Sequence, residues 1–256
     1  MKKILSILLA LATLMSTLAL FSCGKTKDGE TLQRLATKTT GELYFAEKST
    51  LNNAKYYTIT TTRVVTQSEA VGSGKTTETV ITKQSGNNGY AKTSNDKIAG
   101  SETEAWYIYN ESMTYVSKAN SKTKFSNTQD SFKKSYLNKN ANDLIMLNLD
   151  SSDFDEKSFE KSGNYWVIKL VIPKDTYKSA YMQASSSIVN MTALPGSDVE
   201  YNVYFDDNGK LVKIVTSYDI DSAGVGSHCE ITTEVSLTDP LVNAPADASS
   251  YIFQSP

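Results

Sequence analysis

The sequence predicts an α+β protein in which a long antiparallel sheet carries helices against one face. About nine segments combine β-branched and aromatic residues with an alternating pattern, and turn residues separate most of them. Two or three segments between them have apolar residues at helical spacing instead. So many successive strands in one sheet tend to curl, so we expect strong curvature.

The strand segments are joined mainly as hairpins. Asn88-Gly89 and Asn208-Gly209 are dipeptides that favour tight hairpin turns, and Asn110-Glu111-Ser112 separates another pair of strands. The expected strands are Tyr56–Gln67, Thr76–Gln84, Tyr90–Thr93, Ala105–Tyr109, Met113–Lys118, Asn164–Ile172, Val199–Phe205, Leu211–Tyr218 and Cys229–Leu237.

Three further segments are expected to be helical, and the end of the chain is expected to be irregular. Glu42–Asn53 has the composition of a first helix, and one or two short helices are expected between Asn127 and Leu149. Asp175–Val189 repeats its apolar residues every three or four positions. The Pro- and Ala-rich tail Asp239–Phe253 is expected to cross the domain surface without regular structure.

The segment Asn164–Ile172 has apolar residues on both faces. One face carries Trp166, Ile168, Leu170 and Ile172, and the other carries Tyr165, Val167 and Val171, interrupted by Lys169. A strand with solvent on one side alternates more strictly. The sheet is therefore expected to be covered, at least partly, on both sides here.

The first residues have the features of a secretory signal. Lys2 and Lys3 precede an uncharged and largely apolar run, Ile4–Leu20. That run is short for a bilayer span, which needs about 20 apolar residues. A charged start, a short apolar core and a small residue before the cut indicate a cleaved signal peptide.

Leu20-Phe21-Ser22-Cys23 resembles the lipobox of bacterial lipoproteins. The resemblance implies that diacylglycerol is attached to the Cys23 thiol and that the chain is cut just before this residue. Two acyl chains give stable attachment where one is marginal. Residues 1–22 are thus interpreted as a signal peptide, 23–41 as lipid anchor and polar tether, and 42–256 as one domain on the outer side of a bacterial membrane.

Composition restricts the partners. Removal of residues 1–22 takes two of the 26 basic residues and none of the 28 acidic ones, which leaves a net charge of −4. Nucleic-acid binding would require a basic patch, so we expect no nucleic-acid partner. Once Cys23 is acylated, Cys229 has no partner for an intramolecular disulfide, and a small buried side chain is favoured over a reactive thiol.

The order of segments resembles the bacterial lipoprotein carrier superfamily that includes LolA and the LppX-type lipoproteins. The resemblance rests on Cys23, the meander from Tyr56 to Lys118, helical inserts before Asn164–Ile172, and a closing hairpin around Asn208-Gly209. It implies an open half-barrel whose helices pack on the concave side and partly close an apolar face that accommodates acyl chains. The threonines at positions 58 and 60–62 make such a face more polar than a dedicated lipid carrier needs.

No motif indicates catalysis or metal binding. His228 is the only histidine, and its neighbour Cys229 points to the opposite face of a strand. Asp206-Asp207 precedes Asn-Gly in a turn, where aspartate is favoured for backbone reasons. The acidic run Asp150, Asp153, Asp155 and Glu156 lacks the glycine and terminal glutamate of a calcium loop, and is expected to be a solvated loop. We expect a non-enzymatic protein without metal or cofactor, apart from its covalent lipid.

Two functions fit these observations. The curved sheet binds or carries an apolar or amphiphilic ligand such as a lipid, or it docks another envelope protein and has no small-molecule cavity. A carrier requires an unfilled cavity of roughly 300–1,000 Å³. The alternative to a cavity is a filled core, in which the same side chains pack directly beneath the helices. The residues expected to line a cavity are Trp106, Trp166, Ile168, Tyr201, Val203 and Phe205.

Lipidation is tested by the substitution Cys23→Ala. Because the thiol is the acylated atom, the variant is expected to lose radiolabelled fatty-acid incorporation and to leave the membrane fraction. Cys229→Ala is the matched control and should behave as wild type. A Cys23→Ala chain that still sediments with membranes would show that the anchor lies elsewhere.

Overall fold

A computed structural model describes residues 50–51, 53–67, 74–137, 153, 155–184, 194–222 and 225–255. The expected signal peptide, Cys23, the tether and most of the helix Glu42–Asn53 lie outside these residues. Thr50 and Leu51 are helical, and Leu51 is buried against the sheet. Among the described residues, no helix is long and apolar enough to cross a membrane.

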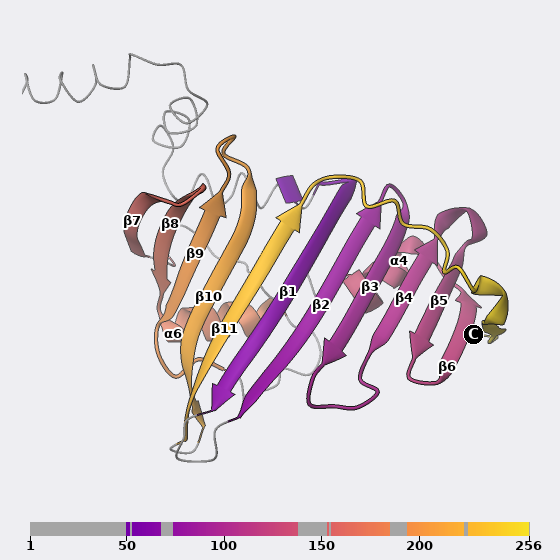
Figure 1. Cartoon of the computed structure of the whole chain (residues 1–256), viewed down its shortest axis with the longest axis horizontal. Helices are drawn as coiled ribbons and strands as arrows, with labels where there is room; N and C mark the ends of the chain where they lie inside the picture. Colours follow the sequence, from indigo (N-terminus) through magenta and orange to yellow (C-terminus); the bar gives the residue numbers. More distant parts are fainter. Residues whose placement is uncertain are drawn as a thin grey trace, which may run out of the picture.

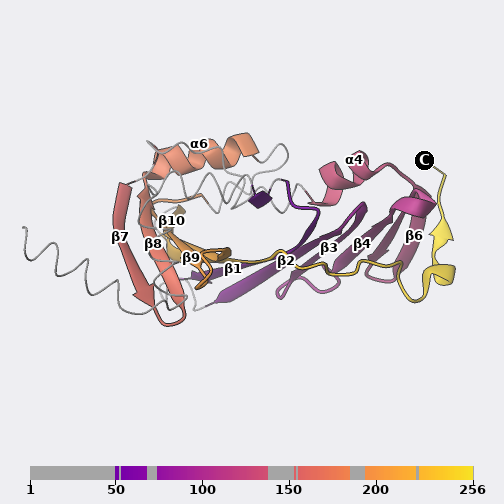
Figure 2. The same ribbon diagram turned by 90° about the horizontal axis from the view of Figure 1, so that it is seen from above.

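The described strands form one 12-stranded open sheet in the order β12-β6-β5-β4-β3-β2-β1-β11-β10-β9-β8-β7 (Figure 1). Neighbours are antiparallel except β12, which is parallel to β6. The sheet curves strongly, so the expected α+β half-barrel class is confirmed (Figure 2). The strands are β1 Tyr56–Gln67, β2 Lys75–Ser85, β3 Asn88–Asn95, β4 Thr103–Ile108, β5 Met113–Lys118, β6 Ser121–Ser126, β7 Asp155–Ser162, β8 Tyr165–Ile172, β9 Val199–Phe205, β10 Leu211–Ser222, β11 Val225–Ser236 and β12 Ile252–Phe253.

Three of these strands are absent from the sequence expectation. β6 and β7 carry few apolar residues, and β7 takes in Asp155 and Glu156, which the sequence assigned to a solvated loop. Both strands lie near the ends of the sheet, where charged side chains protect the edge from further pairing. β12 consists of two residues that pair with β6 across a long sequence separation. The sequences of these three strands show little of the apolar alternation that identifies a strand.

The helices lie over the concave side of the sheet (Figure 2). α4, Gln129–Phe132, begins after Thr128, whose hydroxyl accepts a hydrogen bond from the Ser131 amide at 3.2 Å. It continues as a π-helical turn, η3, Lys133–Leu137. α6, Lys174–Ala184, follows Pro173 and covers the other half of the sheet. The remainders of the expected helices, 138–149 and 185–189, lie outside the described residues.

The β2–β3 turn lies two residues before the expected position. Gly86 adopts a positive φ of 59° and forms the turn with Asn87, whereas Asn88 and Gly89 belong to β3. Gly89 is required there by packing: a Cβ would lie 2.6 Å from Phe132 Cε1. The glycine therefore lets α4 approach the strand. The expected Asn208-Gly209 turn is confirmed, with Gly209 N donating to Asp206 O at 2.8 Å.

The two faces of the sheet differ in polarity. β9 shows it most clearly: Val199, Tyr201, Val203 and Phe205 are buried on the concave face, while the alternate residues are exposed or partly exposed. The concave face holds two apolar clusters, a larger one on β7–β11 and β1 beneath α6, and a smaller one on β3 and β4 beneath α4 and η3. A third small cluster lies on the convex face and includes Tyr115 and Tyr251.

The segment after β11 runs across the sheet as a strap, defined here as residues 237–254 (Figure 1). Asn88 Nδ2 donates to Val242 O at 3.0 Å, and Lys122 pairs with Asp247 further along. Tyr251 is buried edge-on against Tyr115, with ring centroids 5.4 Å apart. The largely irregular course agrees with expectation, but the segment also supplies β12.

Gly89→Ala tests the close approach of α4. The added methyl must displace the Phe132 ring, so we expect a loss of about 1–3 kcal/mol in the free energy of unfolding, measured by urea denaturation. Gly226→Ala is the control, because a Cβ there meets no atom within 4 Å. Equal stability of the two variants would contradict the packing described for Gly89.

Candidate functional site

Five of the six residues expected to line a cavity lie together on the concave face. Cross-strand pairing joins Trp166 to Phe205, Ile168 to Val203 and Leu170 to Tyr201, so these side chains form adjacent rows on β8 and β9. All five expected residues are at most 9% exposed and belong to the larger apolar cluster. Tyr177 and Ala180 of α6 cover this cluster. The structure thus brings these five residues to one surface.

Trp106 lies on the opposite, convex face. It pairs with Tyr90 and Tyr115 across β3–β5, whereas its neighbours Ala105 and Tyr107 face α4. Its ring lies 6.4 Å from that of Tyr251 in the strap. Trp106 is therefore a docking surface for the C-terminal segment and does not join the other five residues.

Several buried polar atoms face the concave side. Trp166 Nε1, Thr82 Oγ1 and Thr216 Oγ1 are buried and, within the described part of the chain, have no hydrogen-bond partner. Thr216 pairs with Tyr201 and Ile231, both in the apolar cluster. A buried polar atom without a partner costs about 1–3 kcal/mol and requires an explanation such as a bound water or ligand. The apolar face thus contains groups that could bind polar atoms.

A polar strip separates the two concave clusters. Thr61 and Thr233 are buried and joined through their hydroxyls at 3.1 Å. On the same face Arg63 forms an ion pair with Glu78 at 3.5 Å, and its side chain is 15% exposed. Since Thr61, Arg63 and Glu78 come from β1 and β2, the strip crosses the centre of the sheet. The concave face is consequently amphipathic.

Cys229 lies at the edge of this strip and is completely buried. Burial raises the pKa of its thiol, and a hydrogen bond with Tyr218 and the nearby charge of Arg63 oppose this only in part. Burial also raises the pKa of Tyr218, which faces Cys229 across β10 and β11. Both groups are therefore neutral at physiological pH. The structure agrees with the interpretation of Cys229 as a small buried side chain.

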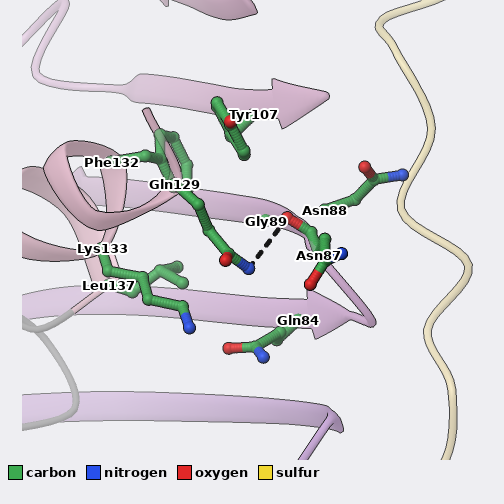
Figure 3. A pocket seen from close by; sticks show the side chains of 9 residues that line it. All are labelled: Gln84, Asn87, Asn88, Gly89, Tyr107, Gln129, Phe132, Lys133 and Leu137. Atoms are coloured by element: carbon green, nitrogen blue, oxygen red, sulfur yellow. Dashed lines mark hydrogen bonds between the residues drawn. The ribbon is translucent and has the colours of Figure 1, made fainter. Parts of the chain in front are cut away.

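A small pocket lies at the rim of the sheet beneath α4 (Figure 3). Gly89, Phe132 and Leu137 form its floor, and Gln129 Nε2 closes one side by donating to Asn87 O at 3.2 Å. It leaves no room for even a water-sized sphere, whereas ordinary ligand pockets measure roughly 300–1,000 Å³. This shallow depression is therefore not a ligand pocket.

The residues considered for catalysis are placed in structural roles. Asp206 Oδ1 accepts from the amides of Asn208 and Lys210 at 2.9 and 2.8 Å, so it stabilises the hairpin turn as expected. His228 pairs with Asp219 at 2.9 Å on the exposed convex side. Among the described residues, no group of three His, Cys, Asp or Glu side chains is arranged to hold a metal ion.

Comparison with known proteins yields structural similarity alone. No family model matches the chain, and no curated protein matches it. LprF from Mycobacterium bovis is 12% identical, with 80% of this chain and 95% of that chain covered, at a TM-score of 0.34. A LolA superfamily protein from Nitrosomonas europaea is 7% identical, with coverage of 82% and 97% and a TM-score of 0.23.

The complex of MucA and MucB from Pseudomonas aeruginosa also contains a similar chain, 9% identical, with coverage of 78% and 95% and a TM-score of 0.23. The open half-barrel that the sequence resemblance implied is the fold observed in the structure.

The burial of Cys229 predicts that it is unreactive in the folded protein. Because the thiolate is disfavoured, the mature lipidated protein should not react with Ellman's reagent at pH 8 while folded, and one thiol, that of Cys229, should react after unfolding in urea. The Cys229→Ala variant, which lacks this thiol, gives the background signal of the assay. Rapid reaction of the native protein would show that the concave face is open to solvent at this point.

Proposed function

We propose that this chain is a membrane-anchored, non-catalytic binding protein that holds an apolar or amphiphilic molecule against the concave face of its half-barrel. The observation that carries the proposal is the amphipathic concave face, in which an extended apolar surface contains buried polar atoms that lack partners within the described residues. Lipids and other acyl compounds likewise combine an extended apolar part with polar atoms.

The apolar part of the ligand would lie along β8 and β9. The larger apolar cluster contains nineteen buried residues, and sixteen of them lie on strands of the sheet. Trp166, Ile168 and Phe205 are among these sixteen. Leu51, Tyr177 and Ala180 are the members that cover them from above. These side chains are already at most 9% exposed, so an elongated apolar molecule would reach them by displacing part of this cover.

The polar part of the ligand would be recognised by the unpartnered groups. The Trp166 indole N–H is a donor, and the Thr216 hydroxyl can donate or accept. An ester, carboxylate or phosphate oxygen would satisfy either group and recover the cost of its burial. The ion pair of Arg63 and Glu78 lies on the same face and favours a ligand with a charged or strongly polar end.

Anchoring through Cys23 completes the proposal. A lipidated N-terminus would keep the binding face close to a membrane, where apolar ligands reside. The alternative function, docking of another envelope protein, is favoured by a different feature. Ile252 and Phe253 are 71% and 51% exposed on β12 at one end of the sheet. An exposed apolar edge strand is a surface on which another chain can pair.

Ile168→Trp tests ligand binding on the concave face. The larger ring would occupy the space of the ligand, so we expect the affinity for cis-parinaric acid, a fluorescent fatty acid, to fall about tenfold or more, with a modest loss of stability. Lys169→Trp, on the exposed face of the same strand, is the matched control.

Two results would contradict the binding proposal. One is the absence of saturable cis-parinaric acid binding by the wild-type protein. The other is a loss of about 1–3 kcal/mol in the unfolding free energy of Ile168→Trp without any change in binding, which would indicate that the space is already filled by protein. The docking function would then remain.

A further inference from the structure

Exposed apolar side chains gather at one rim of the sheet. Among the described residues eight large apolar or aromatic side chains are exposed, and five of them lie where strands begin or end on the same side. Tyr56 is the first residue of β1, and Tyr165 is the first of β8. Antiparallel pairing places these positions at the rim drawn uppermost in Figure 1. The five residues, called the apolar rim below, are Tyr56, Tyr109, Tyr165, Leu237 and Leu241.

A hydrogen-bond network fixes the central part of the apolar rim. Asn88 Oδ1 accepts from Tyr109 N at 2.9 Å, while its Nδ2 donates to Val242 O. Asp239 Oδ1 accepts from Ser85 Oγ at 2.6 Å and from Leu241 N at 3.0 Å. Since Ser85 is also the cross-strand partner of Tyr56, these bonds hold three of the exposed side chains on one rigid frame.

Leu241 is held in an unfavourable conformation. Its φ is 50°, a left-handed value that leucine rarely adopts, and its side chain is 71% exposed. Two hydrogen bonds hold this strained backbone in place: Leu241 N donates to Asp239 Oδ1, and Asn88 Nδ2 donates to Val242 O. Such strain concentrates at functional positions. The fold thus exposes the Leu241 side chain although its backbone conformation is unfavourable.

The chain itself indicates what covers the apolar rim. The described chain passes from Leu51, which covers the concave face, into β1 at Tyr56 on this rim, so the segment that leads back to Cys23 joins the domain close to the rim. Residues 24–49 could span at most about 90 Å if fully extended, so the anchor alone does not fix the domain against the bilayer. It does raise the local concentration of lipid, so that a small apolar surface suffices for docking.

We propose that the apolar rim docks on the lipid bilayer that holds the anchor, with Leu241 in the acyl boundary and Tyr56, Tyr109 and Tyr165 at headgroup level. Tyrosine is enriched at this depth because its ring is apolar and its hydroxyl is polar. The inference rests on the anchoring part of the proposed function. Docking in this orientation turns the rim that borders the concave face toward the membrane that supplies the ligand.

The test uses the mature lipidated protein reconstituted into phosphatidylcholine vesicles. Leu241→Cys is labelled with the polarity-sensitive fluorophore NBD, and Tyr109→Cys provides a second site on the rim. Ile98→Cys is the matched control, because Ile98 is 59% exposed and lies at the opposite rim, between β3 and β4. Cys229 is buried and Cys23 is acylated, so neither should take the label.

Docking predicts a blue-shifted emission at positions 241 and 109 and at least twofold stronger quenching there by doxyl-labelled phosphatidylcholine than at position 98. Equal quenching at the three positions, in protein that floats with the vesicles, would overturn the docking proposal and leave the anchor intact. Failure of the protein to float would overturn the anchor and the docking together. Binding of cis-parinaric acid in the same samples reports on the ligand proposal separately.

Discussion

β1 and β11 lie side by side at the centre of the sheet, although the partners Thr61 and Thr233 are 172 residues apart in the chain. The sheet extends outward from this pair through β2–β6 on one side and β10–β7 on the other, by hairpins except where α6 lies between β8 and β9. Its register decides which residues of the two halves share a face, because a slip of one residue would reverse every side chain. The helices of both halves cover one face for this reason.

The same pairing places the ends of the domain. Antiparallel neighbours run in opposite directions, so β1 begins and β11 ends at one rim. The described chain therefore enters β1 at the rim where the strap leaves β11. The strap then crosses the ends of β2–β5 and covers Trp106 and Tyr115 with Tyr251. The pairing of β1 with β11 thus determines how the exposed rim, the convex cluster and the concave face are placed in the sheet.

The hairpins were predictable because their information is local. Alternation in Val199–Phe205 and the Asn208-Gly209 turn are confirmed, and so is the helix that begins after Pro173. The charged strands β6 and β7 were not predictable, since they are stabilised by neighbouring strands and not by their own composition. Asn88-Gly89 misled the expectation because Gly89 is needed for the approach of Phe132, a contact between distant segments.

The candidate site divides in the same way. Sequence alone determined the fold class and the shared face of Trp166, Ile168 and Leu170, because side chains alternate along any single strand. Only the tertiary structure decided that Trp106 lies on the opposite face, because that relation passes through the register of the six strands between β4 and β8. It also decided that five scattered exposed residues meet at one rim. Alternation is a property of the local backbone, whereas the choice between faces and rims depends on pairing between segments far apart in the chain.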